Sequence, residues 1–162
     1  MRLRDAGPED EERILAWNEA DVHFLAPMDR DRLAYLHERA NAVEIIESGQ
    51  DAAGFIITFI EGADYDSENY CWFSEHETHF HYVDRIVIDP AFRGRGLAAD
   101  TYAALAERYP QRPLVAEVNY APPNPASLAF HERGGFTEVG RRGDQSYGVV
   151  LLRASPSSHV DG

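Results

Sequence analysis

The segment that most constrains this chain is the junction IDPAFRGRGLAAD, residues 88–100, where an apolar strand pattern gives way to a helix pattern. Glycine lets the backbone come close to another group, and a helix N-terminus offers free amide N–H groups and partial positive charge. Arg93 and Arg95 add fixed positive charge at the same place. The combination is typical of a phosphate or other anion site, although a tight turn with two solvated arginines would have the same sequence.

Two kinds of phosphate-bearing cofactor compete for this junction. The letters GRGLAA fit the dinucleotide pattern G-x-G-x-x-A, and Glu117 follows about 20 residues later, where an acid that binds ribose is expected. In that fingerprint the first glycine directly follows the strand, whereas residues 90–93 intervene here. Too little chain remains to build the repeated βαβ domain, and the absence of lysine excludes a Walker-type loop. These points disfavour a dinucleotide or a nucleoside triphosphate.

Composition narrows the class of protein further. A chain of 162 residues suits one domain, expected over residues 1–153, with a disordered tail at 154–162. The net charge of −13 disfavours nucleic acids and anionic membranes as partners; it would attract amines, or it only aids solubility. No apolar run reaches the roughly 20 residues that span a bilayer, and no signal core is seen. One cysteine, Cys71, suits a reducing cytoplasm.

Hydrophobic periodicity predicts a mixed α/β domain. Asn124 can cap a helix over residues 125–133, and Gly134–Gly135 can close it. Residues 61–79 show neither helical nor strand period and are interpreted as one long surface loop. The other predicted helices cover 8–20, the stretch from a cap at Asp29 to residue 40, and 96–109; the predicted strands cover 3–6, 43–47, 53–60, 80–89, 114–119, 136–142 and 146–153.

Two segments, VDRIVIDPAFRGRGLA and NPASLAFHERGGF, resemble the signatures of the GNAT superfamily of acyl-CoA N-acyltransferases. The pyrophosphate signature of that family is Gln/Arg-x-x-Gly-x-Gly/Ala, and the second signature is Asn-x-x-Ala-x-x-Leu-Tyr-x-x-x-Gly-Phe. Each motif alone is weak, but both in this order, separated by a helix and a strand, are rather specific. The matching residues are Arg93, Gly96 and Ala98 for the first signature and Asn124, Gly135 and Phe136 for the second.

The resemblance covers residues 80–153 well and residues 1–60 in element order only. It implies a GNAT fold: a central, mostly antiparallel mixed sheet that splays between its fourth and fifth strands, flanked by about four helices. The unpaired backbone of the splay would bind the pantetheine amides of acetyl-CoA, because buried unpaired backbone is costly. The cofactor-binding residues that it implies are Ile86, Val87, Ile88, Arg93, Gly94, Arg95, Gly96, Leu97, Ala98, Asn124 and Phe130.

Three side chains are candidates for acid–base catalysis of amine acetylation, in which the amine loses a proton and the thiolate gains one. By alternation Asp84 shares a strand face with Tyr82 and Ile86, and Glu117 lies near the expected splay. Either acid could be the base, or could be salt-bridged or solvated. His131 stands where the family usually has its tyrosine acid. Imidazole can protonate a thiolate near neutral pH, but it could equally only contact the cofactor sulfur.

The acidic, aromatic segment 61–79 is the candidate acceptor site. Carboxylates and aromatic rings suit a cationic amine through ion pairing and cation–π contact, although the aromatic side chains could instead lie against the core. No metal is expected, because His76, His79 and His81 have no accompanying ligands at a familiar spacing. The substrate-binding residues predicted from this segment are Tyr65, Glu68, Tyr70 and Trp72.

Together, the motifs predict an acetyl-CoA-dependent N-acetyltransferase that acetylates a primary amine of a small molecule or peptide by direct attack in a ternary complex. The competing hypothesis is a non-catalytic acyl-CoA-binding or sensing domain that kept the cofactor cleft. The sequence names neither the acceptor nor the acyl length, and it leaves the oligomeric state open, with a homodimer as one option.

Overall fold

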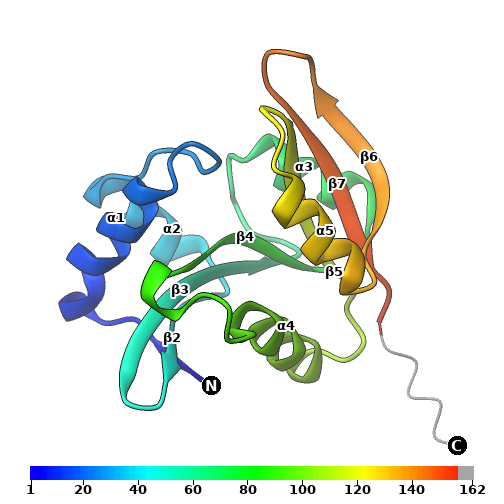
Figure 1. The fold of residues 1–162 in the computed structure, drawn as a ribbon. Coiled ribbons are helices and arrows are strands. Elements are labelled where there is room, and N and C mark those ends of the chain that lie inside the picture. Colours follow the sequence, from blue (N-terminus) through cyan, green and yellow to red (C-terminus); the bar gives the residue numbers. More distant parts are fainter. Residues whose placement is uncertain (157–162) are drawn as a thin grey trace, which may run out of the picture.

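A computed structural model describes residues 1–156, in which one seven-stranded sheet carries helices on both faces (Figure 1). The strand order is β1–β2–β3–β4–β5–β7–β6, and neighbouring strands are antiparallel except β4 and β5, which are parallel. The predicted mostly antiparallel mixed sheet is therefore confirmed. The strands are β1 (Arg2–Asp5), β2 (Ala42–Ser48), β3 (Asp51–Ile60), β4 (His81–Ile88), β5 (Leu114–Ala121), β6 (Thr137–Gly143) and β7 (Gly148–Ala154).

Five α-helices of the described chain cover the two faces of the sheet, one more than the sequence predicted. Apolar side chains of three of them join one core cluster with Phe55 and Tyr82, and those of the other two join a second cluster with Val83 and Val118. Figure 1 shows the first two helices together at one side of the molecule. The first group is α1 (Glu11–Ala20), α2 (Arg30–Arg39) and α3 (Glu68–His76), the second is α4 (Leu97–Arg108) and α5 (Pro125–Arg133), and short 3₁₀ turns lie at Pro8–Asp10 and Pro90–Phe92.

The parallel strands β4 and β5 separate soon after they start. They pair at His81 with Leu114 and at Tyr82 with Val115, and no later residue of β4 pairs with β5 in the described chain. The predicted splay between the fourth and fifth strands is thus confirmed. Because buried N–H and C=O groups need partners, the gap is suited to a ligand that carries amides of its own.

A β-bulge in β4 changes the face to which its side chains point. Opposite residues 57–58 of β3, strand β4 has one residue more than the register requires, and Asp84 is the extra one. Tyr82 consequently belongs to one core cluster and Ile86 packs against the other. The prediction that Asp84 shares a face with both is wrong for Ile86, because a bulge shifts the alternation of side chains by one residue.

The segment 61–79, predicted as one loop, contains helix α3, so that prediction is wrong. The Ser67 hydroxyl caps the helix by accepting a hydrogen bond from the Tyr70 amide at 3.2 Å. Tyr70 and Phe73, three residues apart, are both buried in the core. The helix has nine residues, of which only these two are buried. Two buried residues among acidic neighbours are too few to show a helical period in the sequence.

Two predicted helix caps are confirmed. The Asp29 carboxylate accepts from the Arg32 amide at 2.8 Å, and the Asn124 side chain accepts from the Ser127 amide at 3.3 Å. Strand β7 includes Ala154, which the sequence assigned to the tail. Ser155 and Pro156 lie outside helices and strands, and the rest of that prediction, at residues 157–162, lies outside the described residues. Within the described chain, each helix is too short or too polar to cross a membrane.

Candidate active site

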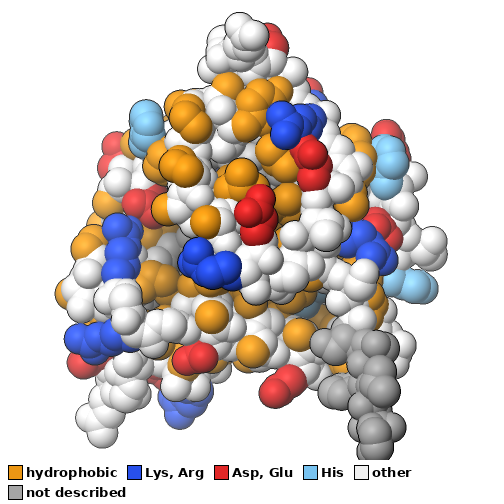
Figure 2. All heavy atoms as spheres, turned by 45° about the vertical axis from the view of Figure 1, so that its right-hand side comes forward, with side chains coloured by type: hydrophobic (Ala, Val, Ile, Leu, Met, Phe, Trp, Pro, Cys, Tyr) orange, Lys and Arg blue, Asp and Glu red, His pale blue; other side chains and the backbone are white. Residues whose placement is uncertain are grey.

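Two cavities meet where β4 and β5 diverge. The larger, of about 730 Å³, lies between α4, α5 and the junction; the smaller, of about 130 Å³, lies in the splay. Among residues 1–156, Tyr102 of α4 is the one residue that lines both cavities. Figure 2 shows the side of the molecule that carries α5 and the β6–β7 hairpin, where hydrophobic side chains gather between scattered arginines and acids. The larger cavity is mostly apolar and the smaller one is lined by several polar side chains. Two such adjoining cavities can hold two reactants side by side.

The junction before α4 presents free backbone amides to the larger cavity. Gly94 and Gly96 have φ values of +79° and +74°, and nothing lies within 4 Å of the point where a Cβ would stand on either. The amides of residues 94–96 donate to no other backbone group of the described chain, and the first amides of α4 are free because the helix begins there. This open cradle fits the diphosphate of acetyl-CoA that the sequence resemblance implies.

Of the eleven predicted cofactor residues, nine line one of the two cavities, and Val87 and Arg95 line neither within the described chain. Arg93 braces the junction, since its Nε donates to the Ile88 carbonyl at 3.1 Å, and the Arg95 guanidinium lies 5.0 Å from the centre of the Phe92 ring. Val87 points to the opposite core cluster. Those that line the larger cavity are Ile88, Arg93, Gly94, Gly96, Leu97, Ala98 and Phe130, and those that line the smaller are Ile86 and Asn124.

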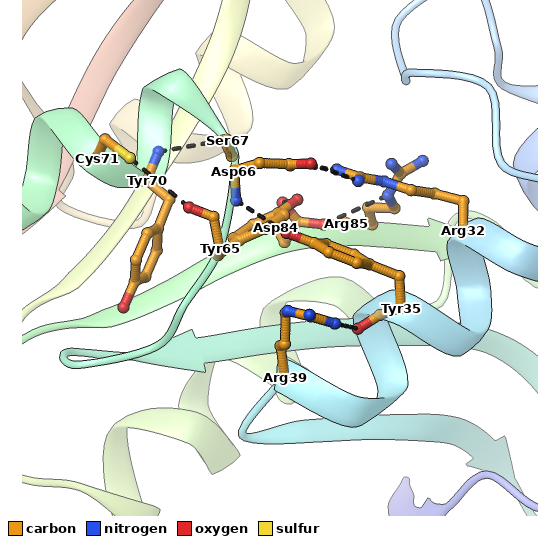
Figure 3. Close-up of polar contacts among 10 residues, drawn as sticks. All are labelled: Arg32, Tyr35, Arg39, Tyr65, Asp66, Ser67, Tyr70, Cys71, Asp84 and Arg85. Atoms are coloured by element: carbon orange, nitrogen blue, oxygen red, sulfur yellow. Dashed lines mark hydrogen bonds and ion pairs between the residues drawn. The ribbon is translucent and has the colours of Figure 1, made fainter.

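Asp84 is held in a buried polar cluster at the edge of the smaller cavity (Figure 3). The Tyr65 hydroxyl donates to Oδ1 at 2.6 Å, and Arg85 Nε donates to Oδ2 at 3.3 Å. Nearby, Arg32 and Asp66 form a two-bonded ion pair at 2.7 and 2.8 Å. Burial raises the pKa of Asp84, and the charge of Arg85 opposes that rise. Both oxygens of this candidate base are therefore engaged.

Glu117 of β5 has one oxygen that is free to bind a substrate. The Tyr82 hydroxyl donates to Oε1 at 2.8 Å, whereas Oε2 is buried and has no partner at hydrogen-bond distance within the described residues. The Asn69 side chain lies near enough to lower the pKa of this carboxyl, as the Tyr82 hydroxyl does. Burial first, and then the charge of Asp84, raise the pKa of Glu117 to about 8. Asn119, two residues along the strand, has a buried side-chain nitrogen that likewise lacks a partner there. An amine with a neighbouring hydrogen-bond acceptor would satisfy both groups.

His131 lies at the other wall of the smaller cavity. Its Nδ1 is 2.7 Å from the Ser127 carbonyl oxygen, and its Nε2 is 2.8 Å from the Tyr102 hydroxyl. Burial lowers the pKa of the imidazole. The sequence did not single out Tyr102, because a tyrosine on the inner face of a helix has the same pattern as a core residue.

The four side chains predicted to bind the acceptor line neither cavity in the described structure. Tyr70 lies in the core, Glu68 is exposed and pairs with an arginine of β6, and Trp72 stacks on a histidine of its own helix. Tyr65 reaches the smaller cavity only through Asp84. The structure favours the alternative that the aromatic side chains lie against the core, where burial of large apolar rings is most favourable.

Within residues 1–156, no group of three or more His, Cys, Asp or Glu side chains could hold a metal ion. The three histidines that the sequence suggested as metal ligands, His76, His79 and His81, have different surroundings. His76 stacks on Trp72, His79 is exposed beside Glu61 at 3.8 Å, and His81 is fully buried.

Comparison with known proteins assigns the chain to a family. A sequence profile described as the acetyltransferase (GNAT) family matches residues 9–136, which include the junction, the splay and α5. The chain therefore belongs to the GNAT family of acetyltransferases, and the resemblance carried by its two motifs is confirmed. A search of curated proteins gave no match.

Solved structures share the fold over nearly the whole chain. The ribosomal-protein-S18-alanine N-acetyltransferase of Escherichia coli has 17% identity and a TM-score of 0.68, with 99% of this chain and 97% of that chain covered. Arabidopsis thaliana NAA60, solved with acetyl-CoA, has 16% identity and a TM-score of 0.68, with 95% and 98% covered. The protein yncA of Salmonella typhimurium, solved with its cofactor acetyl-CoA, has 19% identity and a TM-score of 0.65, with 100% and 97% covered. At such identities the likeness establishes the fold.

Proposed function

We propose that this GNAT protein transfers an acetyl group from acetyl-CoA to a primary amine of a small molecule or peptide, by direct attack while both substrates are bound. The observation that carries the proposal is the Oε2 atom of Glu117, which is buried in the splay and unpartnered within the described residues. The smaller cavity, where this carboxylate lies, adjoins the larger cleft at Tyr102. An amine in one cavity would therefore meet a thioester held in the other.

The larger cavity would hold acetyl-CoA. Its volume of about 730 Å³ is within the usual range of ligand pockets. The amides of residues 94–98 would bind the diphosphate, and the end of β4 at Ile88, which lines this cavity and is unpaired with β5, would bind the pantetheine amides. When bound there, acetyl-CoA supplies an activated acyl carbon and a thiol leaving group.

Glu117 would take the proton that the amine has to lose. A carboxylate whose pKa is raised to about 8 accepts a proton from an alkylammonium far more readily than an ordinary glutamate, whose pKa is about 4.3. Glu117 passes this first proton to solvent, and the neutral amine nitrogen bonds to the acyl carbon as the carbon–sulfur bond breaks. The second proton that the nitrogen loses in this step neutralises the departing thiolate. Asp84 is the weaker candidate for this base, because both of its oxygens already accept hydrogen bonds.

The charges around the smaller cavity favour a cationic acceptor. Asp21, Asp84 and Glu117 line it, and Asp21 and Asp84 are paired with Arg93 and Arg85. The lining becomes net negative once Glu117 ionises, above about pH 8. The net charge of −13 attracts cations over a longer range. The side-chain nitrogen of Asn119 would donate to a hydroxyl or carbonyl oxygen next to the amine. A volume of about 130 Å³ suits the amine end of a substrate.

The substitution Glu117→Gln tests the proposal. We expect kcat for acetylation of polyamines, amino acids or aminoglycosides to fall by about 10²-fold or more, the usual contribution of a general base, with acetyl-CoA affinity unchanged. In the wild type, kcat/KM should rise with pH through about 8, because the base acts only when deprotonated, and that limb should disappear in the variant. Glu107→Gln, an exposed position on α4, is the matched control and should keep full activity.

One result would decide against this function, and another against Glu117 as its base. Tight acetyl-CoA binding by calorimetry without thiol release for any amine would favour the sensing domain. Full activity of Glu117→Gln with an unaltered pH profile would transfer the role of base to Asp84, whose Asp84→Asn variant would then lose the acidic limb.

A further inference from the structure

An ion pair between two charged side chains links the two cavities. Asp21, which follows α1 directly, lines the smaller cavity, and Arg93, in the junction before α4, lines the larger one. Nη2 of Arg93 lies 3.5 Å from Oδ1 of Asp21, and the two side chains are 54% and 33% exposed. The pair therefore joins a group within reach of acetyl-CoA to a group within reach of the amine.

The guanidinium of Arg93 can turn to a diphosphate without leaving the junction. Its Nε donates to the Ile88 carbonyl at 3.1 Å, which holds the side chain beside the open amides of Gly94 and Gly96. The contact with Asp21 is longer than a hydrogen bond of good geometry. A diphosphate carries more negative charge than one carboxylate and can accept two parallel N–H bonds from an arginine. It would therefore replace Asp21 as the partner of Arg93.

Asp21 keeps its place when its arginine partner is taken. Its carbonyl oxygen accepts hydrogen bonds from the amides of Phe24 and Leu25, both at 3.0 Å. Further along the same segment, the buried side chain of Arg85 donates to the Ala26 carbonyl at 2.6 Å. These bonds fix the backbone of the segment independently of the ion pair. The carboxylate then stays in the lining of the smaller cavity without its counter-ion.

We propose that acetyl-CoA, by taking Arg93, frees Asp21 to bind an ammonium group of the acceptor, which deepens the proposed acetyl transfer and rests on it. In the free protein, the guanidinium cancels the charge of this carboxylate, so the smaller cavity attracts a cation less strongly. With acetyl-CoA bound, the carboxylate is available. Asp21 is thus a substrate-binding residue, and Arg93 is the group through which the two cavities are coupled.

The coupling has to act in both directions. A cation at Asp21 releases Arg93 to the diphosphate, just as the diphosphate releases Asp21 to the cation. Partly exposed ion pairs contribute little to stability, so we expect each ligand to strengthen binding of the other by about two- to fivefold.

Calorimetry with CoA tests the exchange of partners whatever the acceptor is. Asp21→Asn should tighten CoA binding about threefold, because Arg93 then has no carboxylate to leave. In an Arg93→Gln background the same change should alter CoA affinity by less than about 1.5-fold. Glu19→Gln removes the same charge from an exposed position on α1 and should leave CoA affinity unchanged. An equal shift in both backgrounds, or an equal shift in Glu19→Gln, would overturn the exchange.

Steady-state kinetics with the best amine of the panel tests the contact with the acceptor. Asp21→Asn should raise KM for the amine about threefold with kcat within about twofold of the wild type, as the loss of a binding contact does. Glu19→Gln should match the wild type. An unchanged KM in Asp21→Asn would overturn the role of Asp21 while acetyl transfer stands. A wild type that releases no thiol with any amine would overturn acetyl transfer and the amine contact together, and the CoA affinities would still decide the exchange.

Discussion

At the scale of single residues, the site depends on a backbone conformation that only glycine adopts readily. Gly96 begins α4 at φ +74°, with open space where a side chain would stand. The space there is what a diphosphate would occupy. A side chain at this position would therefore both strain the backbone and fill the cradle.

We predict that Gly96→Val weakens acetyl-CoA binding at least tenfold by calorimetry, because the side chain would project among the amides that we propose bind the diphosphate. Gly49→Val is the matched control: Gly49 lies in the β2–β3 turn at φ +64°, also with nothing within 4 Å of its Cβ position. The strain of about 1–3 kcal/mol should be similar in both variants. Equal acetyl-CoA affinities in the two would contradict the diphosphate assignment.

At the scale of elements, the short helix α3 packs against strand β6. Trp72 stacks on His76 at 3.7 Å between ring centres and lies against Gly140 of β6. A Cβ on Gly140 would stand 2.6 Å from the Trp72 ring, which is too close for any real contact. Asn69 of the same helix accepts from Arg142 of β6 at 2.8 Å. The helix is therefore fixed on the strand by a flat ring over a glycine.

Gly140→Ala should destabilise the protein by about 1–3 kcal/mol in urea unfolding, because the ring has to leave its stacked position. Removing the ring should remove the conflict, so Gly140→Ala should cost less than about 0.5 kcal/mol in a Trp72→Ala background. An equal cost in both backgrounds would mean that Trp72 does not pack as described.

At the scale of the whole molecule, the two halves of the sheet are joined by very few backbone pairs. Between β4 and β5 these are at His81 and Tyr82, and His81 is fully buried with no partner for either ring nitrogen in the described chain. Burial, and then the charges of Arg108 and Arg112, lower the pKa of His81 to about 4. Protonation of His81 thus destabilises the fold where β4 pairs with β5, next to the splay.

We predict that His81 sets part of the acid sensitivity of the fold. Its folded pKa lies below the unfolded value of about 6.5, so the unfolded chain binds the extra proton between about pH 4 and 6.5 and stability falls as pH falls through that window. From pH 6.5 to 5 this group should remove about 2 kcal/mol of the free energy of unfolding, measured in urea. His81→Phe should lose less over the same interval, whereas His79→Gln at an exposed site should follow the wild type. Identical slopes for His81→Phe and the wild type would refute the prediction.

Local patterns were enough to predict most strands and four of the helices, the caps at Asp29 and Asn124, and the family to which the two motifs belong. These features depend on neighbours along the chain: periodicity, capping and the freedom of glycine act within a few residues. Helix α3 was not predicted because only two of its side chains, Tyr70 and Phe73, are buried in the core. The stabilisation that they give the helix comes from contacts with other segments, which the sequence of this segment does not show.

The chain by itself therefore determined most of its elements and the glycine-rich junction that opens α4. Tertiary structure alone decided the rest: the bulge that turned Asp84 away from Ile86, the free oxygen of Glu117, and the meeting of Tyr102 with His131 from helices 29 residues apart in sequence. The physical reason is that register, burial and the pairing of polar atoms are properties of contacts between distant segments. Such contacts leave no period in the sequence.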